Sequence, residues 1–164
     1  MTNTDIHRYR SLLEPALDEA RIGYQQGNMP CAGAIFDADD ELLGRGHNTA
    51  LSDNNPLLHG ETAAFIASSF GVDGDKSNLT FVTTLSPCWY CAGLIRWFGF
   101  KRLVIGDSTT FSVSESWLRD ADIDVIALDD PDAIDLMQTF IAERPSEWEW
   151  PNAWIEPTAD EVLA

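Results

Sequence analysis

Positive charge is scarce in this chain. Ten Lys and Arg face 27 Asp and Glu among 164 residues, which gives a formal net charge of −17 at pH 7, and the lysines are Lys76 and Lys101 alone. A surface of this sign repels phosphate backbones, so we expect no nucleic-acid partner. Repulsion among the acidic groups also destabilises a compact state unless salt screens it. Two hypotheses follow: a protein adapted to a salt-rich cytosol, or an ordinary acidic bacterial protein.

Long apolar runs and cysteines are also few. No stretch approaches the roughly 18 apolar residues of a membrane helix, and the start, MTNTDIHRYR, has no apolar h-region. We therefore expect neither a membrane span nor a signal peptide. Three cysteines are an odd and low number for the disulfide framework of a secreted domain. These absences favour a cytoplasmic protein.

Repeats, low-complexity tracts and linkers are absent too, which favours a single domain over residues 1–164. The chain is long enough to bury most of its apolar surface without disulfides or a metal as support. The segment from about 146 to 164 is rich in Trp and Pro. We expect it to be a tail that packs over another part of the domain.

The hydrophobic pattern predicts helices that alternate with strands. Helical spacing predicts helices over 5–26, 59–70, 87–98 and 131–144. Strands are expected at 32–37 and 41–46, joined as a hairpin by an Asp-rich turn, and at 79–84, 102–107 and 124–129. Because the later strands are apolar throughout, both faces of the sheet should be covered. The predicted fold is α/β, with three α/β/α layers and a central mixed sheet of about five strands flanked by helices.

Three prolines refine the helix predictions. Pro15 should lie in the first turn of its helix or kink it. Pro87 suits the first position of the helix that follows it. Asp130 and Pro131 suit the N-cap and first position of the last predicted helix.

The segment SPCWYCAGL at 86–94 places Cys88 and Cys91 three residues apart. A disulfide, a redox pair, half of a zinc finger and a catalytic metal site can all begin this way. Upstream, LLHGETAAF supplies His59 and Glu61, which a redox pair does not need. A structural zinc finger would need a fourth ligand, and the available groups (Cys31, His7 and His47) do not have finger-like spacing.

Together the two segments read H-x-E…P-C-x-x-C, the pattern of zinc-dependent nucleobase deaminases. One imidazole and two thiolates leave a fourth tetrahedral position for water, whose pKa the metal lowers. Glu61 would stay off the metal and move protons. Cys88 and Cys91 would share one face at a helix N-terminus, which favours thiolates. Residues two apart on an ideal helix point about 200° apart, so His59 should precede the helical backbone.

Each of these residues also has an ordinary structural explanation. The cysteines could be buried thiols, His59 a core or surface histidine, and Glu61 an acid that complements the helix dipole. Because all four residues occur in this order and between these predicted elements, the sequence favours a deaminase site over a structural or redox site.

With these motifs the chain resembles the fungal-type cytosine deaminases of the cytidine deaminase-like superfamily, over about residues 17–148. The resemblance is carried by GRGHN (44–48), LHGET (58–62), TTLSPCWYCAGLI (83–95), the VIGD strand end, Phe111 and FIAERPSEW (140–148). Nucleoside cytidine deaminases usually have Cys at the first ligand position, and transfer-RNA adenosine and guanine deaminases usually read HAE.

The resemblance implies a cytidine deaminase-like fold, a homodimer and one Zn²⁺ per chain, held by His59, Cys88 and Cys91 with Glu61 as the catalytic acid. It also implies hydrolytic deamination of a free nucleobase, cytosine to uracil and ammonia, in pyrimidine salvage. The implied substrate-binding residues are Asn48, Gly60, Phe111, Trp148, Ser86, Cys31 and Asn152.

Individual roles among these also follow from the resemblance. Asn48 and the Gly60 N–H would bind the pyrimidine carbonyl and ring nitrogen, Phe111 would wall the ring, and Trp148 would close the pocket. Asn48 could instead be a turn residue, and the two aromatics could be core. His47 should be structural or exposed.

Two positions depart from the family. It carries an aspartate on the amino-group side of the base where this chain has Pro151, with Asn152 next and Glu149 near, and a branched apolar residue near Cys31. Exocyclic groups decide base choice. The alternatives are therefore a related aminated base, such as guanine or isocytosine, and, from another class, a non-catalytic zinc-binding interaction domain.

Overall fold

The structure is a computed structural model that describes residues 2–70 and 74–152, with side chains to residue 149. Its centre is a five-stranded mixed sheet in the order β2-β1-β3-β4-β5. The strands are β1 (Ala32–Phe36), β2 (Leu42–His47), β3 (Thr80–Leu85), β4 (Arg102–Asp107) and β5 (Asp124–Ala127). β1 pairs antiparallel with β2 and β3, whereas β4 runs parallel to both β3 and β5.

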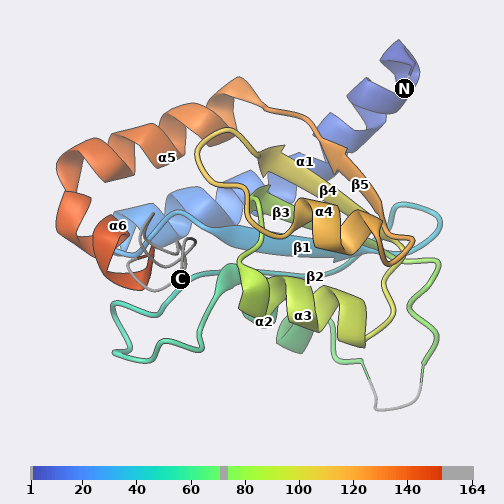
Figure 1. Cartoon of the computed structure of the whole chain (residues 1–164), viewed down its shortest axis with the longest axis horizontal. Helices are drawn as coiled ribbons and strands as arrows, with labels where there is room; N and C mark the ends of the chain where they lie inside the picture. The colour runs from blue at the N-terminus through green and yellow to red at the C-terminus, as the bar shows by residue number, and fades with distance from the viewer. Residues whose placement is uncertain (1, 71–73, 153–164) are drawn as a thin grey trace, which may run out of the picture.

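Helices cover both faces of this sheet (Figure 1). On one face, α1 (Asn3–Gln25) and α5 (Pro131–Glu143) pack on Ala34, Val82 and Val104. On the other face, α2 (Gly60–Ala67), α3 (Trp89–Trp97) and α4 (Glu115–Arg119) pack on Ile35, Phe81 and Leu103. The predicted three-layer α/β/α architecture is confirmed. None of the described helices is long and apolar enough to cross a membrane.

The element boundaries narrow one prediction about proline, correct another and add two helices. Pro15 lies in the interior of α1, which excludes the first-turn alternative and leaves a kink as the prediction. Helix α3 begins at Trp89 with Cys88 as its N-cap, so Pro87 precedes the cap instead of opening the helix. The sequence patterns did not predict α4 or α6 (Pro145–Asn152). Residues 153–164 of the predicted tail, and the side chains of Pro151 and Asn152, lie outside what the structure describes.

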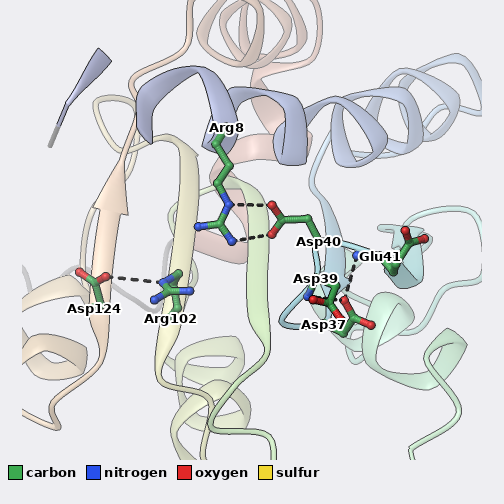
Figure 2. A network of polar contacts seen from close by, with 7 residues as sticks. All are labelled: Arg8, Asp37, Asp39, Asp40, Glu41, Arg102 and Asp124. Carbon is green, nitrogen blue, oxygen red and sulfur yellow. Dashed lines mark hydrogen bonds and ion pairs between the residues drawn. The ribbon is translucent and has the colours of Figure 1, made fainter. Parts of the chain in front are cut away.

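The hairpin turn is tied to α1 by a bidentate ion pair. Figure 2 shows Arg8 on α1 with Nε and Nη2 placed 2.7 and 2.6 Å from the two carboxylate oxygens of Asp40. Asp40 has a φ of 63°, and the Oδ1 atom of Asp37 accepts hydrogen bonds from the N–H groups of Asp39 and Glu41. The Asp-rich turn is therefore a defined structure that holds β1 and β2 in register beside α1.

Close packing of α2 on β1 fixes the position of the α2 N-terminus. A Cβ atom on Gly60 would lie 2.4 Å from the Ala32 Cα atom and 2.5 Å from the Cys31 carbonyl oxygen. No residue with a side chain fits at that distance, so glycine lets the helix start directly against the strand. This contact places His59 and Glu61 at one end of the sheet.

Candidate zinc and substrate site

Three metal-ligating side chains converge where α2 and α3 begin. His59 is the N-cap of α2 and has extended backbone angles, φ −82° and ψ 158°. This confirms the prediction that His59 precedes the helical backbone. The non-helical angle allows His59 and Glu61, two residues apart, to line one cavity.

The spacing of the three side chains fits tetrahedral zinc. The His59 Nδ1 atom lies 3.4 Å from the Cys91 Sγ atom and 3.7 Å from the Cys88 Sγ atom. One possible ligand atom from each residue lies within 4.8 Å of the other two. Zn–N bonds of about 2.0–2.1 Å and Zn–S bonds of about 2.3 Å at tetrahedral angles require N···S separations of roughly 3.6 Å. The three cysteines of the chain are free, so no disulfide competes for the sulfur atoms.

Without a cation, the two thiols of the cluster behave differently. The hydrogen bond from Cys91 and the interaction with His59 lower the pKa of Cys88 to about 4. Burial, together with the hydrogen bond to Cys88, raises the pKa of Cys91 well above its ordinary value. Burial opposes the charge on His59, but the hydrogen bond to Cys88 and the nearby Glu61 outweigh it and raise the histidine pKa. The cluster therefore contains one thiolate and one protonated thiol near neutral pH.

Glu61 is suited to moving a proton. It lies in the first turn of α2 with 6% of its surface exposed. Burial and then the negative charge of Cys88 raise the pKa of Glu61 to about 7. A carboxyl group with a pKa near the working pH can both accept and donate a proton.

A cavity of about 610 Å³ joins the cluster to the predicted substrate-binding residues. Its volume is typical of a small-molecule site. The predicted residues on its wall are Cys31, Asn48, His59, Glu61, Ser86, Cys88, Phe111 and Trp148. Gly60 and Cys91 are not on the wall: Gly60 is buried against β1, and Cys91 is the fully buried member of the cluster.

Asn48 combines the turn role and the cavity position that the sequence left as alternatives. Its backbone N–H donates to the Cys31 carbonyl oxygen at 2.8 Å, and its Oδ1 atom accepts from the Ala50 N–H at 2.9 Å. The side chain is 5% exposed and lies on the cavity wall. Oδ1 already accepts one hydrogen bond, whereas the structure gives Nδ2 none, so Nδ2 is a donor that Asn48 can offer to a ligand.

A carboxylate bridge links the cysteine loop to the loop that carries Phe111. Ser86 donates from its hydroxyl to Glu115 Oε1 at 2.9 Å, and Ser112 donates to the same oxygen at 2.8 Å. Phe111 meets Trp148 edge to face, with ring centroids 6.2 Å apart. The two predicted aromatic walls are thus in contact, and α6 places the second one.

Cys31 and His47 lie outside the cluster of His59, Cys88 and Cys91. Burial raises the pKa of the Cys31 thiol well above its ordinary value, and the charge of Glu61 adds to this, so the thiol is protonated. His47 is structural, as expected, because its Nδ1 atom lies 2.6 Å from Glu19 Oε2.

Sequence reasoning missed several cavity residues. Met29, Leu51 and Leu57 come from loops without hydrophobic periodicity, Tyr90 from the first turn of α3, and Glu147 from α6. Loop residues of this kind give no pattern that a sequence can display. The only available signal was Pro145, which suits the first turn of a helix and would have placed Glu147 and Trp148 on α6.

Comparisons with known proteins agree with this site. Residues 7–107 match the family described as the cytidine and deoxycytidylate deaminase zinc-binding region. A cytosine deaminase of Candida albicans is 38% identical over 136 residues, which cover 83% of this chain and 91% of that protein. A tRNA-specific adenosine deaminase of Haemophilus influenzae is 30% identical over 98 residues, 59% of this chain and 57% of that protein.

Solved structures share the fold at lower identity. A guanine deaminase from Nitrosomonas europaea aligns with a TM-score of 0.63 at 20% identity, over 79% of this chain and 82% of that chain. A structure from a study of A-to-I editing by transfer-RNA deaminases aligns with a TM-score of 0.65 at 21% identity, over 77% and 99% of the two chains.

Proposed function

The chain belongs to the cytidine and deoxycytidylate deaminase family, and from this premise we propose that it is a zinc-dependent hydrolytic deaminase of a free nucleobase, converting cytosine to uracil and ammonia. One observation carries the proposal: a three-ligand cluster and an off-cluster carboxyl group of raised pKa line or adjoin a single cavity. A purely structural zinc site would need neither Glu61 nor the cavity, which weighs against a non-catalytic interaction domain.

His59, Cys88 and Cys91 are the proposed ligands of one zinc ion per chain. When bound, zinc would supply the Lewis acidity that makes water a nucleophile near neutral pH. Two thiolates and a neutral imidazole are a typical donor set for a zinc site of three protein ligands. The N-termini of two helices meet at the site and favour the thiolate charge.

Glu61 is the proposed catalytic residue. It would take a proton from the attacking water, deliver it to the ring nitrogen beside the amino-bearing carbon, and protonate the leaving amine. Water then supplies the carbonyl oxygen, the C–N bond breaks, and the amino group leaves as ammonia. The burial of Glu61 keeps competing solvent away from this transfer.

The remaining cavity residues would hold and orient the base. The Asn48 Nδ2 group is a donor for the base carbonyl, and Phe111 and Trp148 form two aromatic walls. The Gly60 N–H belongs to the first turn of α2, where amide groups lack an intrahelical acceptor, and we propose that it donates to the ring. Cys31, directly before β1, and Ser86, in the cysteine loop, would contact the base. Asn152 remains a proposed contact on the sequence resemblance alone.

Ammonia release from a panel of aminated bases tests the function. Cytosine, isocytosine and guanine should be compared with cytidine, whose sugar a free-base site has no reason to accept. We expect cytosine to give the highest kcat/KM and zinc analysis to give about one ion per chain. A zinc-loaded protein that releases ammonia from none of these bases would refute the proposal. A higher kcat/KM for guanine or isocytosine than for cytosine would instead support the alternative that the substrate is a related aminated base.

We propose that the enzyme is a homodimer, as its aromatic surface supports. Trp89, Tyr90 and Trp97 on α3 are 48%, 44% and 84% exposed, and Trp117 on α4 is 37% exposed. Arg96 stacks over the Trp117 ring at 4.2 Å. Large aromatic side chains gathered on one surface are typical of protein interfaces. Light scattering at micromolar concentration should give twice the 18.2 kDa chain mass, and Trp97→Ser should shift the equilibrium towards monomer.

We further propose a cytoplasmic location and no nucleic-acid partner. The three free cysteines suit a reducing compartment, and the net charge of −17 opposes binding to phosphate backbones. A transfer-RNA gel-shift assay at low salt should show no complex.

A further inference from the structure

Beyond the residues that hold the metal and move the proton, the cavity has a second acidic side chain. Among the residues that the structure describes, Glu61 and Glu147 are the two acidic ones on the wall of the cavity. Glu147 belongs to α6, directly before the aromatic wall Trp148, and is half-buried. Glu149, two residues further along the same helix, is exposed and does not line the cavity.

The Glu147 carboxylate has no hydrogen-bond or ion-pair partner among residues 2–70 and 74–149. The cation nearest in the sequence, Arg144 at the C-cap of α5, donates from Nη1 to the Gly27 carbonyl oxygen at 2.8 Å and lies over the Phe140 ring. That arrangement holds α6 against the loop after α1, which carries the cavity residue Met29. The half-buried carboxylate is therefore left to solvent in the free protein, and an N–H group of a ligand in the cavity can form a charge-assisted hydrogen bond with it.

The other polar groups of the cavity cannot supply a charged acceptor to a base. Asn48 is a neutral amide whose oxygen already accepts from the Ala50 N–H and whose Nδ2 is a donor. The Ser86 hydroxyl proton is directed to Glu115, and His59 and Cys88 belong to the metal cluster. Once Glu61 is engaged in proton transfer, Glu147 is the remaining carboxylate on the wall.

We propose that Glu147 is a specificity-determining residue that accepts a hydrogen bond from an N–H group of the bound base. This inference rests on the proposed function and deepens it by defining the substrate class. In the complex, the Asn48 amide would donate a hydrogen bond to a carbonyl oxygen of the base, and the Glu147 carboxylate would accept one from an N–H group of the base. It therefore selects heterocycles that present both an acceptor and a donor, and rejects rings in which that N–H is replaced.

A chemical double-mutant cycle tests this contact. Equilibrium binding of cytosine and of its N-methylated analogues is measured by tryptophan fluorescence, in a Glu61→Gln background that prevents turnover. Glu147→Gln, which keeps the shape and removes the charge, should weaken cytosine binding about 10- to 100-fold, the range for hydrogen bonds to charged groups. Methylation of the contacted nitrogen should weaken binding when Glu147 is present and have little further effect in Glu147→Gln.

Glu149→Gln is the matched control, because it removes the same charge from the same helix outside the cavity. Equal affinities in Glu147→Gln and Glu149→Gln would overturn the proposal, as would a cycle in which no N–H position couples to Glu147. Failure of the proposed deaminase function would give a different result: the chain with Glu61 intact would release no ammonia from any base, whichever residue occupies position 147. If no base binds the Glu61→Gln protein, the Glu147 contact is refuted as well.

Discussion

The His59 Nδ1 atom lies 3.4 Å from the Cys91 Sγ atom, although 32 residues separate them in the chain. Each belongs to the start of a different helix, and β3 lies between those helices in the sequence. The contact therefore depends on the assembled sheet and not on local structure. It follows that the zinc site and the tertiary fold should support each other.

Zinc affinity should rise with pH. Cys88 is a thiolate above about pH 4, but Cys91 keeps its proton because burial raises its pKa. Zinc must displace that proton, so affinity should rise by about one log unit per pH unit for each proton released. Competition with a chromophoric chelator between about pH 6 and 8 measures this slope. A flat profile would show that Cys91 is not a ligand, and Cys31→Ser, which alters a thiol outside the cluster, should leave the slope unchanged.

Glu61→Gln should abolish turnover while zinc remains bound. General acid–base groups contribute about 10²- to 10⁴-fold to rate, and Glu61 is proposed to act in several proton transfers. The loss should therefore lie at or beyond the upper end of that range in kcat. Metal analysis should still give one zinc per chain, because Glu61 is not part of the ligand cluster. Normal turnover in the variant would eliminate the proposed mechanism.

The same substitution should stabilise the zinc-free protein at high pH. Burial raises the Glu61 pKa to about 7 in the folded chain, above about 4.3 for an unfolded glutamate. The folded state binds more protons between these values, so its stability falls as pH rises from about 4 to 7. Urea unfolding should therefore show Glu61→Gln more stable by on the order of 3–4 kcal/mol at pH 8 and equal near pH 4. A constant difference across pH would contradict this assignment.

The sequence predicted the elements whose signals are local. β4 spans the predicted residues 102–107, and Asp130 caps α5 by accepting from the Asp132 N–H. The H-x-E and C-x-x-C segments predicted the ligand cluster because zinc chemistry restricts the residue types. Short helix α4 and helix α6 were missed, since neither carries a long apolar repeat.

The cavity residues that the sequence did not predict are positioned by contacts between distant parts of the chain. Glu149 and Glu147 are alike by composition and differ only in the face of α6 on which they lie. That face is set by the Arg144 hydrogen bond to Gly27, 117 residues away in the chain. Likewise, the Ser86–Glu115 bridge joins two loops that have no pattern in common. Contacts of this kind depend on how the helices and loops pack around the sheet.

Gly60→Ala should destabilise the fold and disturb the metal cluster. The added methyl group would meet the Ala32 and Cys31 backbone at 2.4 and 2.5 Å, and a backbone cannot move aside as a flexible side chain can. Overpacking of this kind costs about 1–3 kcal/mol, and the shift of α2 should also weaken zinc binding. Gly93→Ala is the matched control, since its Cβ atom would meet nothing within 4 Å on α3. It should be neutral or stabilise by up to about 1 kcal/mol, and equal effects in both variants would contradict the packing argument.

Stability should increase with KCl concentration, because 27 acidic residues face ten basic ones. The Debye length falls from about 10 Å at 0.1 M salt to about 3 Å at 1 M, which removes most repulsion between surface carboxylates. Thermal melts should therefore shift upward between these concentrations. Neutralising Asp53, Asp120 and Glu149 together, three exposed acids without partners among the described residues, should raise the melting temperature at low salt and reduce the shift. A melt that does not change between low and molar KCl would reject salt adaptation and support an ordinary acidic protein, whose fold tolerates its charge without screening.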